Sequence, residues 1–236
     1  MTPVVTRDID RLYPALDRLQ EAHFFLHGLE VYYHVASPFR WHLNTFLRAL
    51  KEVPQIISTT LQNRPGFPSW YKEQRRTLLE DSLIGYLGKQ RDFVVHSGML
   101  RPSSRAMIGV TEGQGMNLAV GGQFDPLSDS NDAIRRYVDA SRTNGDFFGV
   151  LEDDDDSLPA VERRWSLQAF GDIDLVELCA TAWLTMGDHL SSVVSHIGEQ
   201  PPELGLERRH DLSKLRVRAY DREELRSGPV RGFQLE

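Results

Sequence analysis

The chain has 236 residues and a formal net charge of −7, from 27 basic and 34 acidic side chains. Its length suits one large domain or one domain with an elaboration, and its 40% of apolar residues can form a core. The acidic balance argues against a protein that coats nucleic acid over its whole surface, although a local basic groove stays compatible with it. A single cysteine, Cys179, excludes an intrachain disulfide.

No apolar run approaches the roughly 18 residues of a membrane span. The first residues carry charges where a signal peptide would be apolar. We therefore expect a cytoplasmic protein in a reducing environment, without a membrane partner.

Four long helices are predicted from apolar side chains that recur at spacings of three and four. They cover residues 8–35, residues 38–62, a third segment from Ser69 to Gly98, and residues 172–197. Ser69 is a suitable N-cap and Gly98 a suitable end for the third helix. Helices with apolar stripes must bury them against one another, so a four-helix bundle is expected.

The segment between the third and fourth helices has a different character. Apolar runs on both sides of Gly113 and Gly115 predict a β-hairpin, and residues 161–170 suit one more strand. The polar stretch 125–146 reads as partly helical, and residues 152–156 as an acidic, solvated loop.

The predicted architecture is thus mainly α. Residues 1–98 and 172–200 form the helical core, residues 99–171 a small, partly β insertion, and residues 201–236 a charged tail. Within that tail, residues 214–221 alternate like an edge strand, and the remainder is expected to be disordered.

The stretch LGKQRDFVVHSG, residues 87–98, places Arg91, Asp92 and His96 at the end of the third predicted helix. Positions five apart on a helix lie about 140° apart around its axis, a gap that a long arginine can bridge. A guanidinium grips a phosphate, and an imidazole moves protons at neutral pH. Together they suffice for attack of an RNA 2′-hydroxyl on the adjacent phosphodiester without a metal. The simpler reading is a helix C-terminus with cations that suit its dipole.

The helices around this motif resemble the HEPN superfamily of all-helical proteins, many of which are ribonucleases. The resemblance rests on FRWHLNTFLRAL (39–50), GFPSWYKEQRRTLLED (66–81) and RDFVVH (91–96), and it covers residues 8–98 with 172–197 as the closing helix. It implies that Arg91 and His96 are catalytic and that Asp92 orients them. It also implies a homodimer that brings two motifs into one cleft, and a nucleotidyltransferase-type antitoxin as partner.

The leading hypothesis is a metal-independent endoribonuclease that acts on RNA as a homodimer, in a toxin–antitoxin pair or in phage defence. Lys89, Arg101 and Arg105 are the expected RNA-binding cations, and no cofactor or metal is expected. One alternative is a non-catalytic module of the same shape that binds a partner protein, RNA or a nucleotide. Another is a structural helical dimer with residues 172–197 as its interface.

Two further pairs of residues could form binding sites but have simpler structural explanations. His23 and His27 have the spacing of a helical zinc pair, but a third ligand at fitting spacing is absent, which favours core or interface histidines. Arg75 and Arg76 could extend a phosphate-binding surface, although a solvated helix face explains them more simply.

Overall fold

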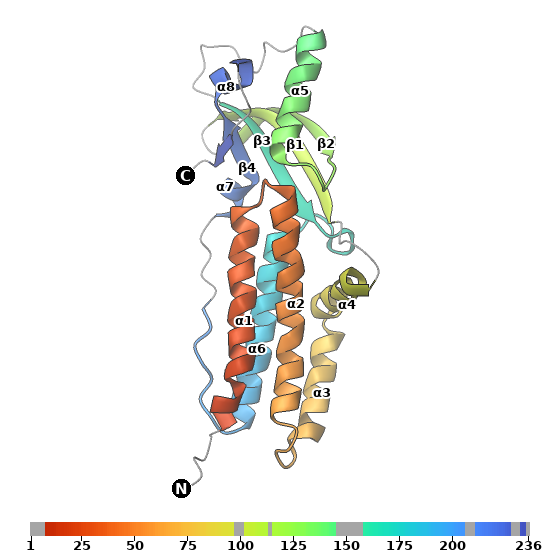
Figure 1. The fold of residues 1–236 in the computed structure, drawn as a ribbon, viewed down its shortest axis with the longest axis vertical. Helices are drawn as coiled ribbons and strands as arrows, with labels where there is room; N and C mark the ends of the chain where they lie inside the picture. The colour runs from red at the N-terminus through yellow and green to blue at the C-terminus, as the bar shows by residue number, and fades with distance from the viewer. Residues whose placement is uncertain are drawn as a thin grey trace. The chain divides into compact units, whose positions relative to one another are not determined.

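A computed structural model describes residues 8–96, 102–112, 115–144, 158–205, 211–227 and 232–234. The protein is mainly helical with a small antiparallel sheet (Figure 1), as predicted. The chain divides into two compact units, each built from three segments. The helical unit comprises Met1–Gly28, Trp41–Leu100 and Val176–Glu207, and the sheet unit comprises Leu29–Arg40, Arg101–Leu175 and Arg208–Glu236.

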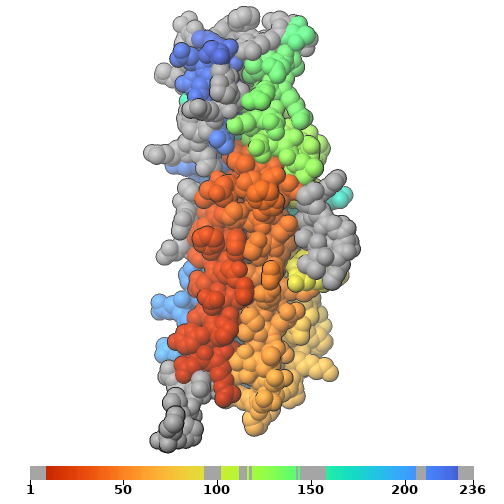
Figure 2. Space-filling model, viewed as in Figure 1, coloured from red at the N-terminus to blue at the C-terminus, as the bar shows by residue number. Residues whose placement is uncertain are grey.

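The helical unit packs long helices side by side (Figures 1 and 2). They are α1 (Asp8–Val31), α2 (Ala36–Thr60), α3 (Phe67–Glu80) and α6 (Leu175–His196), and α4 (Ser82–His96) lies at an angle to them. Two buried hydrogen bonds join helices of this unit. The indole N–H of Trp183 donates to the carbonyl of Leu19 at 2.8 Å, and the hydroxyl of Tyr71 donates to that of Pro54 at 2.9 Å. These contacts tie α6 to α1, and α3 to α2.

The predicted third helix, from Ser69 to Gly98, was wrong as a single element. It is divided at Asp81, whose extended backbone (φ −57°, ψ 127°) ends α3. The Asp81 carboxylate then accepts hydrogen bonds from the backbone N–H groups of Leu83 and Ile84, both at 2.9 Å, and so caps α4. The apolar period continues across this break and concealed it. The other three predicted helices are confirmed, with ends that differ by a few residues.

The sheet unit contains an antiparallel sheet in the order β2-β1-β3-β4-β5. The strands are β1 (Ser103–Glu112), β2 (Gly115–Gln123), β3 (Leu158–Ser166), β4 (Val217–Tyr220) and β5 (Gly232–Gln234), with helices α5 (Ser130–Asn144), α7 (Leu212–Arg216) and α8 (Arg222–Ser227). The predicted hairpin is confirmed as β1 and β2, and the further strand as β3. The predicted acidic loop lies outside the described residues.

The prediction of an edge strand at residues 214–221 was wrong. The strand itself is shorter, because residues 214–216 belong to α7. It is also internal, because β4 pairs with β3 on one side and β5 on the other. Part of the tail expected to be disordered instead forms α8 and β5.

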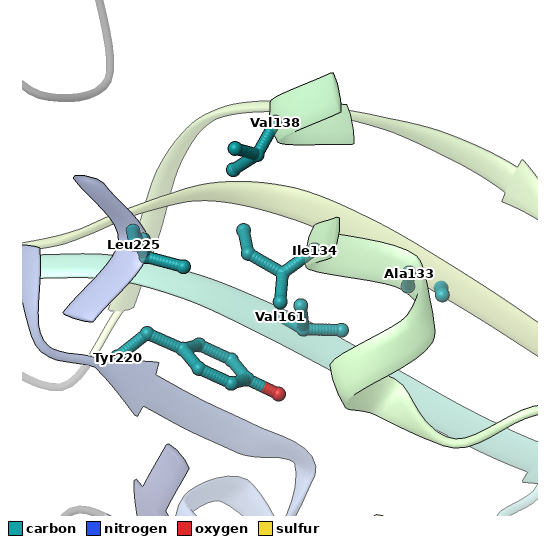
Figure 3. Packing of buried hydrophobic residues seen from close by; sticks show 7 residues of the cluster. Ala133, Ile134, Val138, Val161, Tyr220 and Leu225 are labelled. Atoms are coloured by element: carbon teal, nitrogen blue, oxygen red, sulfur yellow. The ribbon is translucent and has the colours of Figure 1, made fainter. Parts of the chain in front are cut away.

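The core of the sheet unit lies between α5 and the sheet (Figure 3). Ile134 and Val138 of α5 meet Val161 of β3, Tyr220 of β4 and Leu225 of α8. The tail is therefore a structural component of this unit, since β4 and α8 supply part of its core.

The turn between α1 and α2 also belongs to the sheet unit. The indole N–H of Trp165 donates to the carbonyl of Tyr33 at 2.8 Å, and the ring of Phe39 stacks on Trp165 with centroids 4.5 Å apart. On the same strand, the guanidinium of the fully buried Arg163 lies 3.8 Å from the Trp165 ring centroid. A cation–π contact thus accompanies the burial of this charge.

Candidate functional site

Helix α4 carries the candidate motif in its last turns. Arg91 and Asp92 are adjacent, and His96 is the last residue of the helix. The helical backbone separates the Cα atoms of Arg91 and His96 by a rise of roughly 7.5 Å along the axis. The side chain of His96 and the whole of Arg101 lie outside the described residues. Their predicted roles therefore stay predictions.

Asp92 is held by two cations. Nη1 of Arg91 donates to Oδ1 of Asp92 at 3.3 Å, and Nζ of Lys51, from α2, donates to the same oxygen. The hydrogen bond from Lys51 is the main cause that lowers the pKa of Asp92 below its ordinary value of 3.8. At neutral pH, Asp92 is therefore a carboxylate that joins α4 to α2 and fixes the position of Arg91.

Arg91 keeps donors that its carboxylate partner does not use. Its Nε is buried and has no hydrogen-bond partner within the described residues. A guanidinium presents several N–H donors in a fixed fork, and Asp92 takes up Nη1 alone here. The remaining donors suit a second anion, such as a phosphate.

Next to Asp92, a pocket of about 390 Å³ opens among α2, α3, α4 and α6. Its polar lining consists of Lys51, Arg75, Lys89 and the carboxylate of Asp92. Its apolar walls are formed by Leu47, Leu50, Pro54, Leu78, Leu79, Ile84, Leu87 and Met186. The site thus combines apolar walls with an excess of positive charge, and the carboxylate of Asp92 reduces this excess by pairing with Lys51.

The two neighbouring arginines of α3 have different environments. Arg76 pairs with Glu73 and Glu80 along the exposed face of the helix, at 2.9 and 3.1 Å, which confirms the solvated-face reading for this residue. Arg75 lines the pocket beside Asp92, which Arg76 does not, and both arginines border a second pocket of about 610 Å³ along α3. The sequence could not separate the two, because one residue of helical rotation decides which arginine faces inward.

Arg105, another predicted RNA-binding cation, belongs to β1 in the sheet unit. Its Nη1 lies 3.8 Å from Oδ1 of Asp172, and both side chains are exposed. Lys89 is the predicted RNA-binding cation that the structure does place in the pocket beside Asp92.

His23 and His27 lie against each other on α1, with ring centroids 4.5 Å apart, and His23 packs 4.9 Å from the Trp183 ring. Among the described residues, no group of three or more His, Cys, Asp and Glu side chains is placed to hold a metal ion. None of the helices in the described ranges combines the length and the apolar character of a membrane span.

A family model described as bacteriophage lambda protein ea47 matches residues 11–216, which is well over half of the chain. The chain belongs to this ea47 family. A search of curated proteins found no match to the chain, and a search of solved structures found none either. In this ea47-family chain, the matched range includes α4 and every described residue of the pocket beside it.

Sequence reasoning missed Lys51 in this ea47-family site. Lys51 precedes Asp92 by 41 positions, so no local spacing connects them. An available signal was the single lysine on the otherwise apolar inward stripe of α2, close to Leu47, Leu50 and Pro54.

Proposed function

We propose that this ea47-family chain is a HEPN-like, metal-independent endoribonuclease that acts on RNA as a homodimer. One observation carries the proposal. Asp92 is anchored by Lys51 and in turn orients Arg91, whose buried Nε has no partner within the described residues. An oriented guanidinium with unused donors is suited to bind a phosphodiester and the charge that develops on it during attack.

In the proposed reaction, His96 takes the proton of the RNA 2′-hydroxyl. The 2′-oxygen forms a bond to phosphorus, and the bond from phosphorus to the 5′-oxygen breaks. The partner subunit's His96 gives a proton to the departing 5′-oxygen, which leaves a 2′,3′-cyclic phosphate and a 5′-hydroxyl. Arg91 binds the non-bridging oxygens throughout, and Lys89 and Arg101 contact the RNA backbone beside the motif.

The test is cleavage of RNA in the presence of a chelator by wild type, His96→Ala and Arg91→Ala. Each substitution is expected to lower the cleavage rate by about 10²–10⁴-fold. Arg76→Ala is the matched control, because Arg76 pairs with Glu73 and Glu80 on the exposed face of α3 and should leave the rate unchanged. Full activity of His96→Ala, or loss of wild-type activity on chelation, would refute the proposal.

The proposed homodimer and the nucleotidyltransferase-type antitoxin are tested separately. Size-exclusion chromatography with light scattering should give twice the mass of 26.9 kDa. Co-expression with the neighbouring gene should yield a complex that suppresses cleavage. A monomer that cleaves RNA at full rate would contradict the two-motif arrangement.

The pocket favours a second candidate, a module that binds a nucleotide or RNA without cutting it. Its apolar walls and basic side chains suit a ligand independently of any reaction. RNA that is retained in a gel-shift experiment but stays intact would support this alternative over the nuclease.

A further inference from the structure

The pocket beside Asp92 has the size and lining of a small-molecule site. Its volume of about 390 Å³ falls in the range of roughly 300–1,000 Å³ that is typical of ligand pockets. Four helices contribute to its walls, so its shape is fixed by the packing of the helical unit. Apolar side chains from α2, α3 and α4 can cover a flat ring.

The charges of the pocket select an anion. Lys51 is paired with Asp92, whereas Arg75 and Lys89 have no ion pair among the residues that the structure describes. Nε of Arg75 is buried and lacks a hydrogen-bond partner within the described residues. The guanidinium of Arg75 has further N–H donors on its Nη atoms, and these can donate to a phosphate.

Two glycines of α4 line the pocket. Gly85 and Gly88 both line it from α4, where glycine is less favourable than alanine. At Gly85 a Cβ atom would lie 2.7 Å from the carbonyl oxygen of Leu79, so packing requires a glycine there. At Gly88 a Cβ atom would meet nothing within 4 Å in the described part of the chain, so packing there does not require a glycine. Gly88 therefore borders the open space of the pocket.

We propose that this pocket binds one nucleoside monophosphate unit, with its base against the apolar walls and its phosphate on Arg75 and Lys89. The source of the unit is an RNA strand whose next phosphate reaches Arg91. This assignment of RNA as the source rests on the proposed function, whereas the binding of a mononucleotide does not.

Isothermal titration of the full chain with nucleoside 3′-monophosphates tests the pocket, with inorganic phosphate and free nucleosides as partial ligands. The mononucleotide should bind at least tenfold more tightly than either part. Arg75→Ala removes the buried donor, and Gly88→Leu fills the cavity; each should weaken binding at least tenfold. The matched controls Arg76→Ala and Gly88→Ala should stay within about twofold of wild type, with circular dichroism to verify folding.

Competition separates the two sources of the ligand. A short RNA should displace the mononucleotide if the pocket holds one unit of an RNA strand. If RNA fails to displace it, the ligand is a free nucleotide and the assignment of RNA is overturned. Absence of mononucleotide binding, or binding that Arg75→Ala and Gly88→Leu leave unchanged, overturns the pocket itself.

The proposed nucleotide binding and the proposed RNA cleavage can be refuted separately. His96→Ala should bind the mononucleotide as wild type does while losing cleavage. Binding that depends on Arg75, in a protein that does not cleave RNA, would sustain the pocket and refute the nuclease. Cleavage that needs His96, with normal rates in Arg75→Ala and Gly88→Leu, would sustain the nuclease and overturn RNA as the source of the bound unit.

Discussion

Acidification is expected to destabilise the sheet unit through His34, in the turn between α1 and α2. The side chain is buried and makes two hydrogen bonds, with 2.7 Å between Nδ1 and Oγ of Ser130 and 2.9 Å between Nε2 and the carbonyl of Leu215. A carbonyl can only accept, so Nε2 carries the proton and Nδ1 accepts from the hydroxyl. The neutral ring is therefore fully satisfied, and a second proton would charge a buried group.

The size of the effect follows from the pKa of His34. Burial lowers it from 6.5 to about 3, against the opposing hydrogen bond to Leu215 and with help from the charges of Arg218 and Arg163. The unfolded chain, with its ordinary pKa, takes up the proton first as the pH falls. The stabilisation is therefore complete above about pH 6.5 and declines toward pH 3, by about 1.4 kcal/mol per pH unit. Between about pH 6 and pH 4, His34 should remove about 2.5 kcal/mol of unfolding free energy.

Urea unfolding of wild type and His34→Gln, followed by the fluorescence of Trp165 and the other tryptophans, measures how much His34 contributes to the unfolding free energy at each pH. Glutamine cannot titrate. Between about pH 6 and pH 4, the unfolding free energy of His34→Gln should therefore fall by about 2.5 kcal/mol less than that of wild type. Groups common to both proteins, including His189 with a pKa lowered to about 4 by burial, cancel in the difference. Parallel pH profiles for the two proteins would refute the reasoning.

Three substitutions in the helical unit test its local features. Asp81→Ala removes the cap of α4 and should lower the unfolding free energy in urea by about 1 kcal/mol. Asp81→Asn should retain most of the stabilisation by the cap, and equal losses in the two variants would contradict the cap. Gly88→Ala should raise the unfolding free energy by about 0.5–1 kcal/mol in thermal melts, and a lowered melting temperature would contradict the open space there. Lys51→Met should raise the pKa of Asp92 toward 3.8 in a carboxyl NMR titration while costing less than about 1 kcal/mol, and an unmoved pKa would contradict the ion pair.

Local patterns predicted the helices and the hairpin because those elements depend on spacing within one segment. The same logic failed at Asp81, where the apolar period runs on although one capping carboxylate starts a new helix. The signal was present, since aspartate is a preferred N-cap, but periodicity over thirty residues outweighed a single side chain. Helix boundaries inside a continuous apolar stripe are therefore best sought at such residues.

Long-range pairing accounts for the other differences between the predicted and the observed structure. The alternation at residues 214–221 predicts a strand, but the internal position of β4 in the sheet depends on β5, whose three residues are too few to show a period. In the same way, the motif on α4 predicted the adjacency of Arg91 and Asp92. The sequence did not connect them to Lys51 or to Arg75, because these come from other helices.

Both units are discontinuous in the chain, and this affects how the protein can be made and dissected. The ribosome releases Leu29–Arg40 long before Arg208–Glu236, so the sheet unit cannot close until this last of its three segments has been made. A truncation before Arg208 would remove β4 and leave β3 with an open edge, which invites aggregation. Neither unit corresponds to a contiguous fragment, so biochemical work on either one calls for the intact polypeptide.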